Sequence, residues 1–133
     1  MFEITLVKEI FAIVAHPPGG FVDPRECERR VFVCGSLMEP KFLANLLGHE
    51  AAMAPALARG HIRGWGETDG KKFHFLRADP GGTVHGVVLL GLSDADMEKL
   101  EQFERVPEVR RRADIEAAIG DVALPAVTYL AKD

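Results

Sequence analysis

The sequence predicts an α+β fold, in which two main helices accompany a small mixed, largely antiparallel and barrel-like β-sheet. Two helical patterns, one beginning near Pro40 and one near Asp94, stand among six or seven short strand patterns. Turn residues of hairpin length separate several of these strands. No internal repeat or low-complexity segment is visible in the sequence.

Length and composition fit one soluble globular domain. The chain has 133 residues, of which 47% are hydrophobic and 27% charged, enough for one core but not for two. The formal net charge is −4, and the basic residues are scattered apart from the run at 110–112, so no nucleic-acid partner is expected. The apolar stretch at 10–15 is too short to span a bilayer and fits a signal peptide poorly, so no membrane partner is expected.

The cysteines and histidines predict neither a metal nor a cofactor. Cys27 and Cys34 lack the paired spacing of a zinc site, and we interpret both as reduced thiols of a cytoplasmic protein. The spacing of His61, His74 and His85 matches no ligand motif either. These histidines are interpreted as ordinary residues of strand surfaces.

Residues 1–30 form an N-terminal arm of uncertain structure, and the well-patterned domain covers residues 31–133. A helical stripe fits the apolar residues of the arm (Phe2, Leu6, Ile10, Ile13 and Val14), although Ile4 and Leu6 also permit a short strand. Turn or linker chemistry follows at 16–20 and at Asp23-Pro24. The arm would pack on the domain, mediate contacts in a homodimer, or be partly disordered; a start codon assigned too early is a further alternative.

The domain begins with a strand, a loop and a helix. The apolar run Val31 to Val33 predicts a buried strand that enters a tight loop. Pro40 suits the first turn of a helix that Gly48 ends. The apolar face of this helix has four members: Phe42, Leu43, Leu46 and Leu47.

Further strands are predicted at 51–58, 61–65, 73–76, 83–90, 109–117 and 122–130. Gly60 is expected to separate the first two strands, and the Asp-Pro-Gly-Gly sequence at 79–82 is expected to form a turn. Pro125 predicts an edge or a bulge in the last strand. Trp65 and residues 73–75 are expected in the core or in a pocket wall.

The second helix has a complete start signal. Ser93 and Asp96 form a weak capping box, and Leu92 and Met97 occupy the positions of a hydrophobic staple. The helix is therefore expected to begin near Asp94.

Glu104 lies on the apolar side of this helix. At about 100° per residue, Met97, Leu100 and Phe103 form one stripe, and Glu104 projects only about 40° from its centre. A carboxylate held against apolar surface near a helix C-terminus should have a raised pKa and act as a general acid/base near neutral pH. The pattern alone favours the alternative, a frayed terminal residue that reaches water or pairs with one of four arginines: Arg105, Arg110, Arg111 and Arg112.

The loop from Cys34 to Met38 is the second candidate site. Gly35 lets the chain turn so that successive backbone amides converge on an anion such as a carboxylate. The loop matches neither the nucleophile elbow nor the phosphate-binding P-loop. Cys34 as a nucleophile is an alternative, but a buried structural thiol is the favoured interpretation.

Three segments resemble the gamma-glutamylcyclotransferase-like family, which includes the AIG2-like proteins: VFVCGSLM at 31–38, VHGVVLLGLSDADMEKLEQFE at 84–104 and AVTYL at 126–130. In that family a hydrophobic strand runs into a Tyr-Gly-Ser-Leu/Asn loop, and a later strand contains Val-x-Gly-x-Val. A helix then ends in a Leu-Asp-x-x-Glu-Gly segment that holds the catalytic glutamate. The Leu-Glu-Gln-Phe-Glu sequence at 100–104 is similar to this last element, so the resemblance places Glu104 at the catalytic position.

The resemblance implies a metal-independent enzyme that releases 5-oxoproline from a γ-glutamyl amine or γ-glutamyl amino acid. The free α-amine of the substrate attacks its own γ-carbonyl, and an amine or amino acid leaves. Glu104 would carry the proton from the ammonium to the leaving nitrogen. The backbone amides of Gly35, Ser36 and Leu37 would hold the α-carboxylate or a developing oxyanion.

Three positions depart from the family pattern. Cys34 replaces the usual loop tyrosine, Arg105 replaces the glycine after the catalytic glutamate, and Glu108 stands where an aromatic residue is common before Arg110. Arg105 would either bind an acidic substrate or pair with Glu104. These substitutions support an alternative function, a non-catalytic small-ligand binding or assembly module on the same fold.

Overall fold

The computed structural model describes residues 3–7, 12–16, 23–68 and 70–131. The strands within these ranges are β1 (Glu3–Val7), β2 (Ala12–His16), β3 (Arg30–Val33), β4 (Ala52–Thr68), β5 (Lys71–Leu90), β6 (Arg110–Ile119) and β7 (Val122–Ala131). The helices are α1 (Pro40–Leu47) and α2 (Asp94–Phe103), and two short 3-10 turns are η1 (Pro24–Glu26) and η2 (Gly35–Met38).

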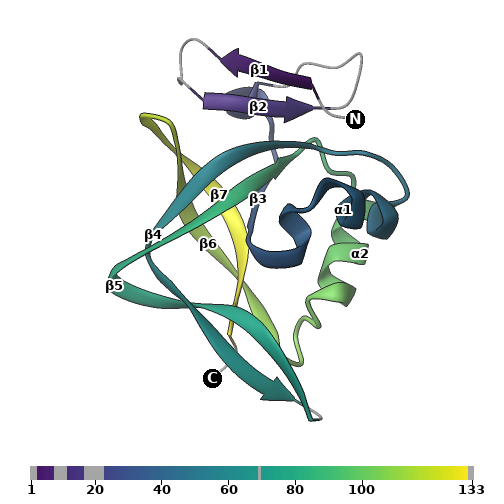
Figure 1. Cartoon of the computed structure of the whole chain (residues 1–133), viewed down its shortest axis with the longest axis vertical. Helices are drawn as coiled ribbons and strands as arrows, with labels where there is room; N and C mark the ends of the chain where they lie inside the picture. The colour runs from purple at the N-terminus through teal and green to yellow at the C-terminus, as the bar shows by residue number, and fades with distance from the viewer. Residues whose placement is uncertain (1–2, 8–11, 17–22, 69, 132–133) are drawn as a thin grey trace.

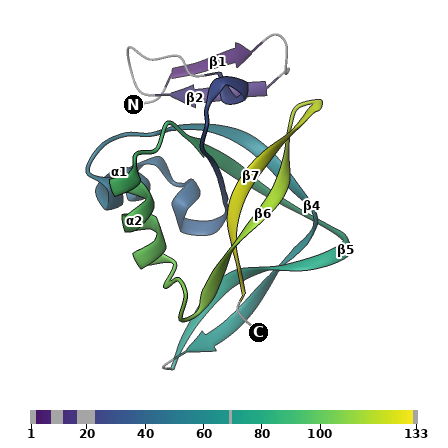
Figure 2. The same cartoon turned by 180° about the vertical axis from the view of Figure 1, so that it is seen from behind.

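Five strands close into a barrel. They are hydrogen-bonded in the order β4-β5-β3-β7-β6, and β6 returns to pair with β4 at Leu57 and Ala118. The pairs are antiparallel except that β7 runs parallel to β3 and to β5. The predicted α+β fold with a mixed, largely antiparallel barrel is therefore confirmed. Figures 1 and 2 show α1 and α2 side by side on one flank of this barrel.

The alternation of side chains on β3 divides the core into two clusters. Phe32 belongs to the cluster inside the barrel, which also contains four alanines of β4: Ala52, Ala54, Ala56 and Ala58. Val31 and Val33 point the other way, toward Leu43 of α1 and Leu100 of α2. Both helices are therefore packed against the strand that leads into the Cys34 loop.

The two longest strands differ from the prediction. The predicted strands 51–58 and 61–65 both lie in β4, and 73–76 and 83–90 both lie in β5. The expectation of a turn at 79–82 is wrong, because these residues lie within β5. β4 and β5 therefore form one long, bent hairpin, which extends below the helices in Figure 1.

A bulge at Gly60 explains why the glycine does not end the strand. Arg59 pairs with Thr83, but His61 pairs with Ala78, so Gly60 lies opposite four residues of β5. Gly60 has a φ of 79°, a conformation that glycine adopts without strain. The strand therefore bends at this position and continues.

Both predicted helix starts are confirmed. α1 begins at Pro40, and the chain leaves it through Gly48. α2 begins at Asp94, and Ser93 Oγ accepts a hydrogen bond from the Asp96 amide at 3.1 Å. Asp96 Oδ2 accepts one from the Ser93 amide at 2.9 Å, which completes the capping box.

The strand alternative for the N-terminal arm is observed in its described parts. β1 and β2 form an antiparallel hairpin, and β2 reaches the barrel where Ala15 pairs with Met53. Phe2, Ile10 and residues 17–20 of the linker predicted at 16–20 lie outside the described residues, and His16 is the last residue of β2.

The last two predicted strands are confirmed as β6 and β7. Pro125 produces no bulge, because it pairs in unbroken register with Glu116. It precedes Val127, where β7 meets β3. The carbonyl of Pro125 instead accepts a hydrogen bond from Arg30 Nε at 2.6 Å.

Candidate active site

A cavity of about 350 Å³ lies where the barrel, the end of α2 and the Cys34 loop meet. Cys34, Gly35, Ser36 and Leu37 line one part of it, and Glu104 lines another. The β4–β5 hairpin and β7 contribute further lining residues. The structure therefore brings together two segments that are far apart in the sequence and that were both predicted as candidate sites.

The loop geometry follows from the residues that connect β3 to α1. Gly35 has a φ of 81°, which lets the chain turn into η2 directly after β3. Leu37 is buried and anchors the turn in the core, whereas Ser36 is exposed. Because the first N–H groups of a helical turn have no acceptor within it, the loop presents donors at its start.

Glu104 is an ordered helix end. It is the C-cap residue of α2, and its N–H donates to the carbonyl of Leu100 at 2.8 Å. Its side chain is only 14% exposed. Burial raises the pKa of the Glu104 carboxyl, and the charge of Arg110 opposes that rise without cancelling it. The end of α2 is therefore not frayed, but the other part of that alternative, an ion pair between Glu104 and one of the four arginines, is observed.

Arg110 is the arginine that pairs with Glu104. Its Nε lies 3.0 Å from Glu104 Oε2, and its side chain is 11% exposed. Arg110 Nη1 also donates to the Glu104 carbonyl at 2.8 Å, and Nη2 donates to the His74 carbonyl at 2.7 Å. Arg110 thus fixes the carboxylate and ties the end of α2 to β5.

Arg105 is the one predicted site residue that is not among the described residues lining the cavity. Its guanidinium forms an ion pair with Glu108 at 3.7 Å. Arg105 has a φ of 57°, in the left-handed region that glycine adopts most readily. This conformation would suit the glycine that the resemblance described above leads one to expect at this position.

Cys34 is partly buried in the cavity wall. Burial raises the pKa of its thiol, an effect that the nearby Arg63 opposes. Because the reactive form of cysteine is the thiolate, this environment does not favour the nucleophile alternative. Cys34 and Cys27 are both free thiols.

The described residues contain no group of three or more His, Cys, Asp or Glu side chains that could hold a metal ion. His61 and His74 therefore do not form a ligand cluster with His85. Within the same part of the chain, none of the helices is long and apolar enough to cross a membrane.

Several cavity residues were missed or only partly anticipated. Trp65 is a wall residue and not a core residue, because it is 69% exposed. Lys72 and His74 line the cavity from β5, and Tyr129 lines it from β7. The Tyr129 hydroxyl donates to Glu101 Oε2 at 3.1 Å. Because side chains alternate between the two faces of a strand, the sequence of the hairpin could have predicted that Trp65, Lys72 and His74 share one face.

The family model described as "Gamma-glutamyl cyclotransferase, AIG2-like" matches residues 31–133. The chain therefore belongs to this family. Among its curated relatives, the chain is 32% identical to Protein AIG2 C of Arabidopsis thaliana over 62% of this chain and 47% of the relative. It is 29% identical to the AIG2-like protein C of the same plant over 77% of this chain and 59% of the relative. The chain thus spans about half the length of these relatives.

Solved structures show the same fold. A structure named "Gamma-glutamyl cyclotransferase" superposes with a TM-score of 0.69 at 17% identity, over 79% of this chain and 67% of that chain. A solution structure of an Arabidopsis thaliana protein superposes with a TM-score of 0.65 at 28% identity, over 77% of this chain and 61% of that chain.

Proposed function

We propose that the protein is a γ-glutamyl cyclotransferase-like enzyme that releases 5-oxoproline from a γ-glutamyl amine or γ-glutamyl amino acid. One observation carries this proposal: Glu104, with a side chain only 14% exposed, lines the same cavity as the Cys34–Leu37 loop. The cavity, at about 350 Å³, lies in the range that small-molecule sites occupy.

The proposed reaction is an intramolecular aminolysis. The substrate's α-amine nitrogen attacks its γ-carbonyl carbon, a new C–N bond closes the five-membered ring, and the C–N bond to the leaving amine breaks. The attacking nitrogen loses a proton and the leaving nitrogen gains one, so Glu104 acts first as base and then as acid. The raised pKa of Glu104 suits both steps. All atoms are supplied by the substrate, and the proposal assigns no cofactor or metal.

The Cys34–Leu37 loop has the positioning role in this proposal. Donors from Gly35, Ser36 and Leu37 would hold the α-carboxylate or the oxyanion that develops on the γ-carbonyl. Holding the substrate in a folded conformer makes ring closure easy, because the reacting atoms are already close. We further propose that the enzyme works in the cytoplasm, and that a homodimer is the oligomer to test for.

A screen for 5-oxoproline release tests this function. γ-Glutamyl dipeptides, γ-glutamyl amines and glutathione are incubated with the wild type and with Glu104→Gln, and products are quantified by mass spectrometry. Loss of a general acid/base should lower turnover by roughly 10²- to 10⁴-fold. Glu108→Gln is the matched control, because Glu108 is a nearby carboxylate with a side chain 76% exposed. Equal activity of wild type and Glu104→Gln on every substrate would refute the proposal.

The second candidate function is a non-catalytic module that binds a small ligand. The 3.0 Å ion pair between Arg110 and Glu104 favours it, because a nearby positive charge stabilises the ionised carboxylate. Such a module would bind γ-glutamyl compounds and return them unchanged. Calorimetric binding without 5-oxoproline formation would therefore identify it.

A further inference from the structure

One face of the β4–β5 hairpin runs from the cavity to the tip of the hairpin. Three cross-strand pairs form it: Arg63 with Leu76, Trp65 with His74, and Glu67 with Lys72. Alternate residues of a strand point to the same side, so these pairs share one face. Trp65, Lys72 and His74 of this face line the cavity. A second hollow near the tip shares Trp65 and Lys72 with it.

Trp65 gives this face an apolar wall. It is the only tryptophan of the chain, and it is 69% exposed. Its ring stands edge-on to the His74 ring, with centroids 3.9 Å apart. A ring held in place by its neighbour presents a large contact area to a bound molecule.

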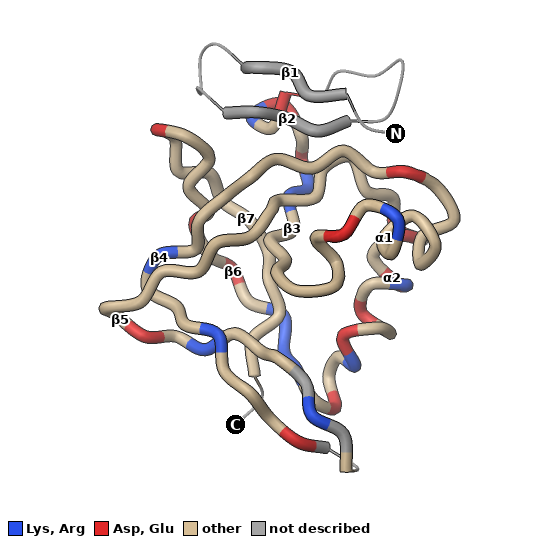
Figure 3. Tube along the Cα trace, in the orientation of Figure 1, with Lys and Arg blue, Asp and Glu red and all other residues tan. Residues whose placement is uncertain are grey.

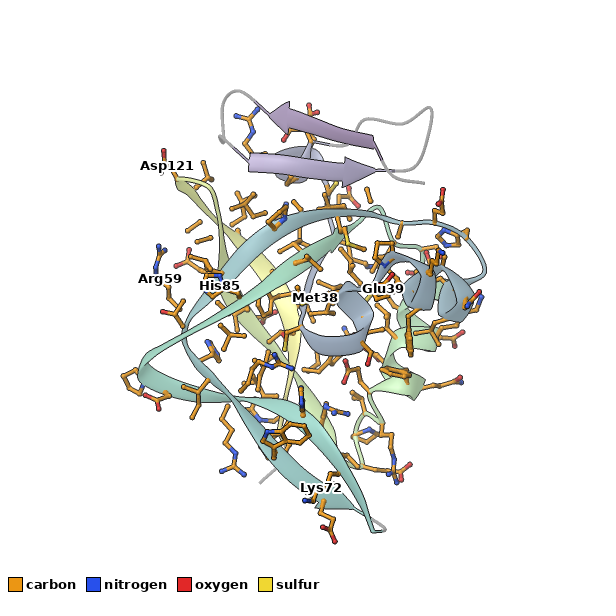
Figure 4. The ribbon with its side chains drawn as sticks, viewed as in Figure 1. Met38, Glu39, Arg59, Lys72, His85 and Asp121 are labelled. Atoms are coloured by element: carbon orange, nitrogen blue, oxygen red, sulfur yellow. The ribbon has the colours of Figure 1, made fainter. Side chains whose placement is uncertain are left out.

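Two cations lie on either side of this wall. The Arg63 guanidinium contacts His74 Nδ1 and lies 3.7 Å from the position that a Cβ on Gly35 would take, beside the loop. Lys72 lies at the tip of the hairpin, as Figure 4 shows. Within the described part of the chain neither Arg63 nor Lys72 forms an ion pair, although Glu67 is the cross-strand neighbour of Lys72. Figure 3 shows these basic segments on the hairpin.

The spacing of the two cations suits a ligand with two carboxylates. Arg63 and the Glu67–Lys72 pair are four residues apart along β4, which corresponds to roughly 13 Å. The two carboxylates of an extended γ-glutamyl amino acid are roughly 9 Å apart by standard bond lengths. The long, flexible side chains of Arg63 and Lys72 can bring their charged groups closer together than the backbone positions, and so match the separation of the two carboxylates. A γ-glutamyl amine whose leaving group has no carboxylate can use only one of the cations.

We propose that Trp65, Lys72 and His74 form a leaving-group subsite that selects γ-glutamyl amino acids over γ-glutamyl amines without a second carboxylate, and that Arg63 stands at the glutamyl end of the bound molecule. This inference rests on the proposed function, because it assigns the substrate class of the same cavity. Arg63 lies at the loop end, near the glutamyl carboxylate. Lys72 receives the carboxylate of the leaving amino acid, and Trp65 packs against its side chain.

Two ligands that differ only in one carboxylate test the subsite: γ-glutamyl-phenylalanine and γ-glutamyl-phenethylamine. Binding is measured by calorimetry with the Glu104→Gln variant, so that a failure of turnover and a failure of the subsite are separate results. The kcat/KM for 5-oxoproline release is measured in parallel with the wild type. One charge-assisted hydrogen bond should favour the carboxylate ligand by roughly 10- to 100-fold in Kd.

Substitutions on the hairpin then locate the effect. When Lys72→Gln is combined with Glu104→Gln, the ratio of the two Kd values should fall to within about threefold of unity. Lys72→Arg in the same background should retain the preference for the carboxylate ligand. Arg59→Gln is the matched control, since Arg59 lies on β4 away from the tip (Figure 4), and it should leave the preference unchanged. Equal affinity for both ligands, no binding of either ligand, or a preference that survives Lys72→Gln would overturn the subsite. Absence of 5-oxoproline despite selective binding would overturn the proposed function alone.

Discussion

Replacing Arg110 by methionine should destabilise the protein in a pH-dependent way. The substitution removes the 3.0 Å ion pair with Glu104 and the hydrogen bonds to two carbonyls, those of Glu104 and His74. Breaking a buried pair by removing one partner costs about 3–5 kcal/mol, because the other charge stays buried without compensation. Both side chains are nearly buried here, so we expect a loss in this range at pH 8.

The sign of the pH dependence follows from Glu104. Its pKa in the folded protein is raised by burial, so folding favours the protonated form. The stability of the fold therefore falls as the pH rises from the ordinary glutamate value through the raised value. Without Arg110 the pKa rises further, and each tenfold gain in proton affinity adds about 1.4 kcal/mol to the loss at high pH. At pH 5 Glu104 can take up a proton, and the loss should be smaller.

Urea denaturation at pH 5 and pH 8 measures this difference as the free energy of unfolding. Arg111→Met is the control, because Arg111 is an exposed neighbour on the same strand. The control should change stability by no more than about 0.5 kcal/mol at either pH. An equal loss for Arg110→Met at both pH values, or a larger loss at pH 5, would refute the reasoning.

Three further predictions concern the elements that support the site. The pKa of His49 is raised by its hydrogen bond to the Glu50 carbonyl and by Asp96. Protonated His49 therefore stabilises the fold fully below the ordinary histidine pKa, and this stabilisation is lost as the pH rises through the raised pKa. His49→Gln should therefore destabilise more at pH 5.5 than at pH 8.5, by less than about 1 kcal/mol because His49 is half-exposed; a larger loss at pH 8.5 would contradict this. Ser93→Ala should remove the α2 cap and lower the unfolding free energy by about 1 kcal/mol in urea denaturation, and no change would show that the cap is unimportant. Gly35→Ala should lower the free energy of unfolding by about 1–2 kcal/mol, because alanine adopts the φ of 81° only with strain. A Cβ at this position would meet nothing closer than 3.7 Å, so the loss would come from the backbone and not from a clash. A thermal-shift experiment that shows no loss of stability would contradict this argument.

Local signals predicted both helix starts and the position of Glu104 on the apolar side of α2. Ser93, Asp96 and the proline at position 40 act on backbone groups within a few residues, so their effects are visible in the sequence. The position of Glu104 on the apolar side of α2 follows from helical periodicity and is consistent with its burial. The continuous hairpin was not predictable in the same way, because the bulge at Gly60 depends on which residues face each other across β4 and β5.

Tertiary contacts set the remaining features of the site. Four arginines follow Glu104 within eight residues, and spacing does not distinguish them. The turn between α2 and β6 brings Arg110 back to the carboxylate, whereas Arg105 pairs with Glu108. The sequence likewise did not show that Trp65 is exposed, since it was expected either in the core or in a pocket wall. Which of the four arginines pairs with Glu104 could therefore be identified only from the folded structure.

The central claim is that Glu104 titrates above an ordinary glutamate and carries the proton in catalysis. A ¹³C-detected carboxyl NMR titration of Glu104, combined with the pH dependence of kcat/KM for 5-oxoproline release, tests both halves at once. We predict a Glu104 pKa above about 4.3, the ordinary glutamate value, that coincides with the acid limb of kcat/KM. A Glu104 pKa at or below that value, or an acid limb that persists unchanged in Glu104→Gln, would contradict the account.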